Sequence, residues 1–233
     1  LYTPGIPGAG VAPTSAIAGD ALTSYPGQIP FTNPVSGSAY LARLSLTPTA
    51  GGRLLVFDRL WHNATIVSAT TTAQTVTSAA WPARDKGATT DGEGVYIAIE
   101  VSTATTNAGA ITNTTMSYTN SAGTSGRTAT IASFPATAVA GTFVFFRLQA
   151  GDTGVRSIQS VTLGTSYGTG VIHLVAVRAL ADIPGLVSNA GVALDAVGLG
   201  LPLLHDNTVP FFVWQPTGTT GMTWRGFIVY SHG

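Results

Sequence analysis

The pattern of apolar and polar positions along the chain changes near residue 38. From there on, short runs rich in β-branched and aromatic residues alternate with clusters of Gly, Thr, Asn and Ser. Runs of this length and composition are typical of β-strands separated by turns. The sequence therefore predicts strands at 39–46, 53–61, 64–69, 94–101, 114–119, 126–133, 142–149, 155–163, 170–178, 209–215 and 222–230.

Two segments of this region give more specific predictions. MSYTNSAGTSGRTATI, residues 116–131, has two alternating halves around a glycine-containing connection and predicts a β-hairpin. NAGVALDAVGLG, residues 189–200, is the nearest candidate for a helix, but three glycines interrupt it and it has no polar face. We expect a buried loop there.

About ten short strands at regular spacing favour an all-β fold, namely one antiparallel β-sandwich over residues 38–233, most simply jelly-roll-like. An open sandwich has to protect its edge strands, commonly with lysines, prolines or inward charges. This chain has one lysine, and its prolines lie mostly outside the predicted strands. We therefore expect the edges to be covered by an arm of the chain, by a neighbouring subunit, or by both.

Residues 1–37 have a different composition. They contain six prolines and six glycines, a density that excludes helices and central strands. A disordered tail is one interpretation, but disordered segments are usually charged and poor in bulky apolar residues. Here Asp20 is the single charge among several apolar and aromatic residues. The segment is therefore predicted to be an extended arm that lies on its own subunit or on a neighbour.

Charge is scarce throughout the chain. The 233 residues include 10 basic and 10 acidic side chains, and 9% of residues are charged, against roughly 25% in an ordinary soluble domain. We expect part of the surface to be covered by a partner and part to consist of Thr, Ser, Asn and Gly. A homo-oligomer is expected, and analogy with other sandwiches suggests a trimer.

The same composition argues against several partners and sites. With Lys86 as the only lysine and the arginines dispersed, no basic cluster is present to bind nucleic acid. No apolar run reaches the ~18 residues of a membrane span. The sequence lacks cysteine and the H-E-x-x-H, H-x-H, Walker and Rossmann motifs. We expect no catalytic residue, no cofactor and no metal, and therefore not an enzyme.

A few polar residues need a separate interpretation. Asp91 and Glu93 precede a predicted strand, where calcium binding or a simple turn would explain them, and we favour the turn. Glu100, seven residues after Glu93, offers only a weak case for the paired carboxylates of a glycosidase. His173, inside GVIHLVAVR, is interpreted as a satisfied core or interface histidine.

The segment LLVFDRLWHN, residues 54–63, concentrates Asp58, Arg59 and His62 in an apolar strand. Alternation places Asp58 and Arg59 on opposite faces, so each needs a partner elsewhere. Asp58 and His62 share a face, but at ~3.4 Å per residue their Cα atoms lie roughly 13 Å apart. This spacing disfavours an acid–base pair, and we interpret the three residues as fold- or interface-specifying polar groups.

Aromatic side chains could serve a different function, the stacking of sugar rings. Trp214 and Trp224 lie in apolar runs and are expected in the core. Trp81, beside Pro82, is equally compatible with the core and with glycan stacking. Tyr118 and Tyr167 are further aromatic candidates.

Four segments, at 41–63, 81–101, 118–131 and 198–214, resemble a group of tailed-bacteriophage virion proteins: LARLSLTPTAGGRLLVFDRLWHN, WPARDKGATTDGEGVYIAIEV, YTNSAGTSGRTATI and GLGLPLLHDNTVPFFVW. The resemblance covers most of residues 38–230. It implies a β-rich virion structural protein that decorates or cements the capsid by contacts with the major capsid protein or other virion proteins, or that builds a head or tail appendage. A β-sandwich module that binds host-surface glycans is the alternative.

Overall fold

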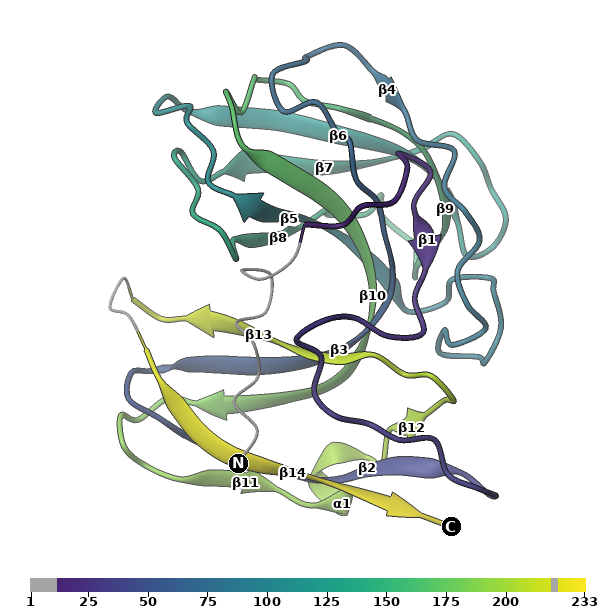
Figure 1. Ribbon diagram of the computed structural model, residues 1–233, viewed down its shortest axis with the longest axis vertical. Coiled ribbons are helices and arrows are strands. Elements are labelled where there is room, and N and C mark those ends of the chain that lie inside the picture. The colour runs from purple at the N-terminus through teal and green to yellow at the C-terminus, as the bar shows by residue number, and fades with distance from the viewer. Residues whose placement is uncertain (1–11, 219–221) are drawn as a thin grey trace. The chain divides into compact units, whose positions relative to one another are not determined.

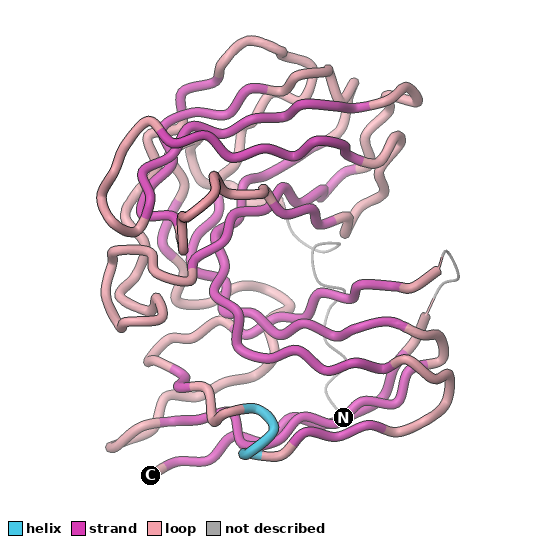
Figure 2. The backbone as a smooth tube through the Cα atoms, turned by 180° about the vertical axis from the view of Figure 1, so that it is seen from behind, coloured by secondary structure: helices cyan, strands magenta, loops and turns pink. Residues whose placement is uncertain are grey.

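The computed structural model describes residues 12–218 and 222–233. Strands account for nearly all of its regular structure, and α1 (Ala196–Leu199) is the single helix in these two ranges (Figures 1 and 2). The described chain forms three sheets, in which all the paired strands with a printed register run antiparallel. The expected all-β, sandwich-type fold class is confirmed.

The alternating pattern locates the long strands well. Every predicted strand segment but one contains a strand. These are β2 (Ala39–Pro48), β3 (Gly52–His62), β5 (Val95–Thr103), β6 (Ile111–Asn120), β7 (Arg127–Phe134), β8 (Phe143–Phe145), β9 (Val155–Thr162), β10 (Val171–Gly185), β13 (Pro210–Pro216) and β14 (Trp224–His232). The pattern misses four strands of two or three residues: β1 (Asp20–Ala21), β4 (Gln74–Thr75), β11 (Val192–Leu194) and β12 (Leu203–Leu204).

The exception is segment 64–69, where the strand prediction is wrong. Only an isolated bridge between Ile66 and Ile172 forms there. Thr65 has a φ of 64°, a left-handed conformation that interrupts an extended backbone. The predicted hairpin at 116–131, by contrast, is confirmed by β6 and β7, which pair up to Tyr118 and Arg127.

The prediction for residues 189–200 is also wrong, because this segment is neither buried nor without regular structure. It contains β11 followed by the single turn of α1, and none of the α1 residues is buried. The Asp195 carboxylate caps the turn by accepting hydrogen bonds from the Val197 and Gly198 N–H groups, and Gly200 ends it with a φ of 68°. The glycine that argued against a helix is its C-terminal cap.

The described chain divides into two compact units. Unit 1 contains the described residues up to Gln28 together with Arg59–Arg178, and unit 2 contains Ile29–Asp58 and the described part of Ala179–Gly233. Strands β3 and β10 contribute residues to both. This division differs from the expected boundary between an arm, residues 1–37, and a sandwich, residues 38–233. The jelly-roll topology and the extended arm remain predictions. Residues 1–11 of the predicted arm lie outside the described residues.

Unit 1 has two sheet layers. One layer has the order β4-β9-β6-β7, and the other is the part of the six-stranded sheet with the order β1-β3-β10-β5-β8 (Figure 1). Backbone hydrogen bonds join the layers at both margins. Thr130 and Arg147 exchange two of them at 2.9 and 3.0 Å. At the other margin, Ser78 N–H donates to a β9 carbonyl and Ala79 N–H donates to Ala18 O, both at 2.9 Å.

The core between these layers is built around two tryptophans. Trp61 and Trp81 pack edge to face with ring centroids 5.1 Å apart. The Trp81 indole N–H donates to the Val155 carbonyl at 2.6 Å, and the Trp61 N–H donates to Ala18 O at 3.1 Å. Both rings are therefore buried with their polar atoms satisfied.

Unit 2 has its own core. In its first layer β2 lies between β14 on one side and β11 and β12 on the other. Its second layer includes β13 paired with residues Gly52–Asp58 of β3. The expected core positions of Trp214 and Trp224 are supported, since both are half-buried against the apolar core of unit 2. Trp224 packs edge to face on Phe212, with ring centroids 4.7 Å apart.

Candidate functional site

Asp58, Arg59 and His62 are all buried, Asp58 and Arg59 completely so. The Asp58 carboxylate accepts a hydrogen bond from the Val209 N–H at 2.9 Å within unit 2. Arg59 and His62 belong to unit 1, where they join a cluster of polar side chains from three neighbouring strands. We call this the Arg59 cluster: Arg59 and His62 on β3, His173 on β10, Glu100 and Ser102 on β5, with Tyr25 and Asn63 beside them.

The centre of the Arg59 cluster is an ion pair. Arg59 Nη2 lies 2.5 Å from Glu100 Oε2, and both side chains are at most 2% exposed. The Arg59 guanidinium also stacks over the Tyr25 ring, with Cζ 4.2 Å from the ring centroid. In the sheet β10 separates β3 from β5. The pair therefore connects two strands that do not themselves pair, and holds Tyr25 of the N-terminal segment against them.

His62 is kept neutral by this arrangement. Arg59 donates to His62 Nδ1 from Nε and Nη2, at 3.3 and 3.2 Å, so Nδ1 must be unprotonated. Burial, with the Arg59 charge and His173 acting in the same direction, lowers the pKa of His62 to about 3. Strict alternation would place Arg59 and His62, three residues apart in β3, on opposite faces, so it does not predict this contact.

His173 is also held neutral, by partners on both ring nitrogens. Its Nδ1 lies 3.0 Å from the Asn63 carbonyl, which only accepts hydrogen bonds, so Nδ1 carries the proton. Its Nε2 then accepts from the Ser102 hydroxyl at 2.6 Å. Burial lowers the pKa of His173 to about 4, against the opposing effects of Glu100 and the Asn63 hydrogen bond. The expectation of a satisfied core histidine is confirmed.

This serine–imidazole pair has the orientation that nucleophilic catalysis requires, because the imidazole accepts the hydroxyl proton. A base with a pKa of about 4 is nevertheless poorly matched to proton abstraction near neutral pH. Each named hydrogen bond of His173 also joins β10 to a neighbouring segment. The Arg59 cluster is therefore best interpreted as a device that fixes the positions of β3, β10, β5 and the N-terminal segment.

A second buried polar centre organises the loop 82–94. Asp85 accepts hydrogen bonds from the N–H groups of Gly87, Thr89, Gly92 and Glu93. Burial raises the pKa of this carboxyl, but these hydrogen bonds outweigh that effect and leave the pKa below its usual value.

The acidic residues of the loop 82–94 are engaged with the protein itself. Asp91 pairs with Arg156 at 2.6 Å, and Glu93 accepts from Thr153 at 2.6 Å. These contacts support the turn interpretation of Asp91 and Glu93. In the described ranges, no group of three or more His, Asp or Glu residues is placed to hold a metal ion.

The glycan-stacking role considered for Trp81 is not supported. This side chain is 2% exposed and is packed against Trp61, so neither ring face is open to a sugar. Tyr118 and Tyr167 are fully buried as well. The position of Trp81 beside a proline suggested a surface turn, whereas the fold uses the ring as core.

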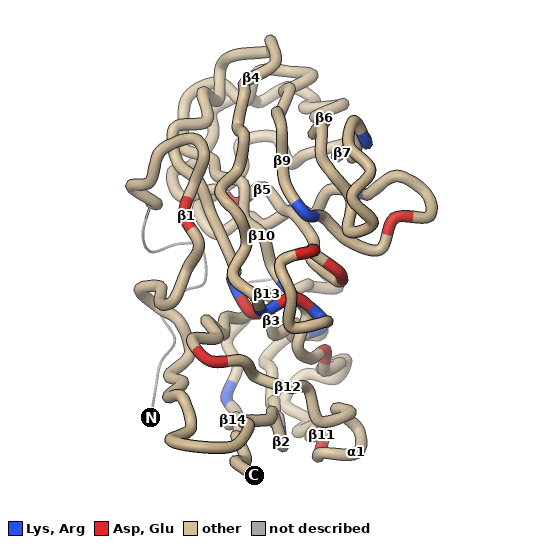
Figure 3. The backbone as a smooth tube through the Cα atoms, turned by 90° about the vertical axis from the view of Figure 1, so that its right-hand side faces the viewer, with Lys and Arg blue, Asp and Glu red and all other residues tan. Residues whose placement is uncertain are grey.

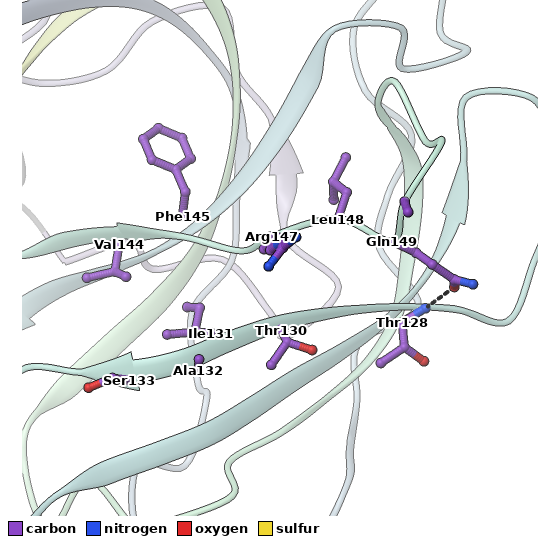
Figure 4. Close-up of a pocket in the computed structure, with 11 residues that line it drawn as sticks. Thr128, Thr130, Ile131, Ala132, Ser133, Val144, Phe145, Arg147, Leu148 and Gln149 are labelled. Atoms are coloured by element: carbon purple, nitrogen blue, oxygen red, sulfur yellow. Dashed lines mark hydrogen bonds between the residues drawn. The ribbon is translucent and has the colours of Figure 1, made fainter.

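A surface cleft lies instead between β7 and a wall formed by β8 and the segment that follows it (Figure 4). Its volume is about 530 Å³. The lining combines the Phe145 ring and Leu148 with polar side chains from Thr128, Arg147 and Gln149. The sequence gives no signal for this cleft, because its two walls are about 15 residues apart. They meet through the Thr130–Arg147 bridge and a hydrogen bond from the Thr128 N–H to Gln149 (Figure 4).

The strength of the buried ion pair can be tested by removing one partner. Glu100→Gln leaves the Arg59 charge buried without its counter-ion, so we expect it to lower the free energy of unfolding by about 3–5 kcal/mol. The double variant R59M/E100L removes both charges and recovers much of this loss. Urea unfolding followed by tryptophan fluorescence measures both. Asp182→Asn, which breaks the exposed pair with Arg53, is the control and costs less than about 1 kcal/mol. A Glu100→Gln variant as stable as the parent chain contradicts this assignment.

The two neutral histidines predict a pH dependence of stability. In the unfolded chain they titrate near 6.5, whereas in the folded chain their pKa values are about 3 and about 4. Unfolding therefore takes up protons below pH 6.5, and stability, fully present above that pH, falls as the pH is lowered toward 4. The slope approaches about 1.4 kcal/mol per pH unit for each histidine.

Urea midpoints between pH 7.5 and roughly 4.5, above most carboxyl titration, measure this slope. Variants His62→Gln and His173→Gln should each reduce it by about half. His232→Gln, at an exposed position, should leave it unchanged. A stability that is constant over this range overturns the assignment of neutral buried histidines.

No helix in the described part of the chain is long and apolar enough to cross a membrane. Comparisons with protein-family models, with curated proteins and with solved structures find no match to this chain. The function proposed below therefore rests on the residues of this chain, on their geometry and on the resemblance noted in the sequence.

Proposed function

We propose that this chain is a non-enzymatic structural protein of a tailed-bacteriophage virion, which decorates or cements the capsid through subunit contacts. The observation that carries the proposal is the distribution of charge and apolar surface. Charged residues are few along the chain (Figure 3), and several of them are buried. The buried ones are Asp58, Arg59, Arg84, Asp85, Glu100 and Arg178.

The surface correspondingly carries large apolar side chains. Those at least half exposed are Val35, Val67, Val139, Leu186, Val187, Val197 and Phe227. Scattered apolar residues are normal on any protein, but here little charge surrounds them to keep separate molecules apart. Such a surface suits a protein that is covered by neighbours in an assembly.

Decoration would stabilise a shell by bridging adjacent capsid subunits. The driving force is the burial of apolar surface at about 25 cal/mol per Å², reduced by the entropy lost on association. The resemblance of residues 38–230 to phage virion proteins supports the same role. Within the predicted arm, β1 pairs with β3 and the Ile29 N–H donates to Pro210 O, so this segment is able to add to strand edges.

The proposal predicts saturable binding to shells. Shells formed by the major capsid protein of the phage that encodes this chain, and prepared without it, are mixed with the purified protein and sedimented. We expect co-sedimentation to a fixed ratio of chain to capsid subunit. No co-sedimentation at any ratio contradicts the proposal.

The contribution of the arm is tested in the same assay. Deletion of residues 1–37 should abolish binding, but it also removes Leu22, Tyr25 and Ile29, which are buried. Deletion of residues 1–11 leaves these three in place and should weaken binding. Wild-type occupancy by both shortened chains would remove the arm from the proposal.

Glycan binding is the second candidate, and the surface cleft is the observation that favours it. An aromatic ring beside guanidinium, amide and hydroxyl groups is a common arrangement for a sugar, which stacks on the ring and hydrogen-bonds at its rim. On a glycan array, Arg147→Ala and Gln149→Ala should then each lower binding at least about tenfold, equivalent to about 1.4 kcal/mol. Arg225→Ala, on β14 and outside the cleft, is the control. No binding by the parent chain excludes this function on the glycans tested.

A further inference from the structure

Strand β14 forms an open edge of the four-stranded sheet in unit 2. Its nine residues pair with β2, and no other segment of the described chain pairs with it. Two large apolar side chains on the strand are exposed, Phe227 at 52% and Val229 at 40%. In unit 1, by contrast, backbone hydrogen bonds join the two layers at both margins.

The hydrogen bonds next to β14 show which of its backbone groups face outward. Thr223 accepts from the Thr49 N–H, and Gly233 and Ser38 exchange two hydrogen bonds, all toward the β2 side. In an antiparallel ladder alternate residues direct both backbone groups to the same side. Odd-numbered residues therefore face β2. The N–H and C=O groups directed to the open edge belong to Trp224, Gly226, Ile228, Tyr230 and His232.

This edge lacks the usual protection against pairing. Between Trp224 and His232 there is no proline, no lysine and no acidic residue, and Arg225 is the single permanent charge. The one register irregularity of the β2–β14 pair places the extra residue, Ala42, on β2, so β14 itself is not bulged. A long, regular and nearly uncharged edge is a template for another strand.

We propose that the occupant of this edge is β14 of a second copy of the chain, paired antiparallel about a twofold axis at Ile228. This register pairs all nine residues. Each residue whose backbone groups face the edge then lies opposite an edge-facing residue of the second copy: Ile228 opposite Ile228, Gly226 opposite Tyr230, and Trp224 opposite His232. Each copy then donates its five outward N–H groups to carbonyls of the other, and the two sheets become one continuous sheet.

The side chains suit the same register. On the solvent face Phe227 of one copy lies opposite Val229 of the other, twice by symmetry, so the two exposed apolar residues cover each other. Arg225 lies opposite Ser231, and no like charges meet. Cross-strand apolar pairs of this kind each contribute roughly 0.2–1 kcal/mol. An isologous contact that closes on itself also ends at the dimer instead of growing into a fibre.

The contact is small, which sets its strength. Nine residues a side is fewer than the roughly 20–30 of a typical stable interface, so the dimer is reversible with a dissociation constant on the order of micromolar. This inference goes beyond the proposed virion role and does not depend on it, because it concerns the isolated chain.

Charge substitutions at the two facing positions test the register. Sedimentation velocity across roughly 1 to 100 µM should show a monomer–dimer equilibrium for the parent chain, since this range brackets the expected constant. In F227E/V229E, acidic side chains lie opposite each other across the axis and the dimer should be lost. In F227K/V229E, opposite charges meet instead, and dimerisation should return. Both variants place the position-229 carboxylate across from Arg43 of β2. At position 227, whose ring lies 5.4 Å from Arg43 Cζ, one variant is acidic and the other basic, so the stability of each monomer is measured beside its dimerisation.

The controls separate this surface from others. L186E/V197E adds the same charge at two exposed positions outside β14 and should leave the dimer unchanged. Circular dichroism and thermal unfolding confirm that each variant is folded. A chain lacking residues 1–11 tests whether its own N-terminal segment covers the edge. A parent chain that stays monomeric at all concentrations overturns the proposal, as does one that dimerises only without residues 1–11, or a dimer that persists in F227E/V229E.

Discussion

The buried ion pair between Arg59 and Glu100 is the interaction on which the organisation of unit 1 depends. A charge removed from water needs a partner and hydrogen bonds, and here β3 supplies the cation while β5 supplies the anion. His62 and Tyr25 contact Arg59, and His173, which bonds Asn63, lies close enough to interact with both charges. Because a shift of either strand would leave a charge without its partner, the ion pair favours one register of β3, β10 and β5 over the alternatives.

The use of charge inside the fold bears on how the protein meets its surroundings. A chain with so few ionisable residues that buries several of them has little charge left for its surface. Unit 1 links its two layers at both margins through the bridge at Thr130 and the contact between Ala79 and Ala18. Unit 2 leaves β14 open. The proposed role in a virion and the proposed pairing of β14 have the same basis. In both, other chains would cover surfaces that this chain leaves exposed.

The polar residues that first suggest catalysis are engaged in hydrogen bonds between strands and within loops. Ser102 and His173 have a favourable hydrogen-bond orientation, but burial makes the imidazole a weak base and both ring nitrogens are bound. The carboxylates of the loop 82–94 close turns and pair with neighbours. The cleft beside β7 and β8 is exposed to a small ligand, whereas Trp81, which the sequence suggested for glycan stacking, is buried.

The sequence by itself determined the strand content of this protein. Alternating β-branched and aromatic runs place the long strands to within a few residues, except that β10 continues to Gly185, and they locate the β6–β7 hairpin, because these features depend on neighbours in the chain. It also required that Asp58 and Arg59 find separate partners. Only the tertiary structure decided which partners: Glu100 lies 41 residues from Arg59 in sequence, and the two side chains meet because their strands, β5 and β3, both pair with β10. The burial of Trp81, the two units, the cleft and the open edge of β14 all depend on which strands become neighbours, and local pattern does not specify that.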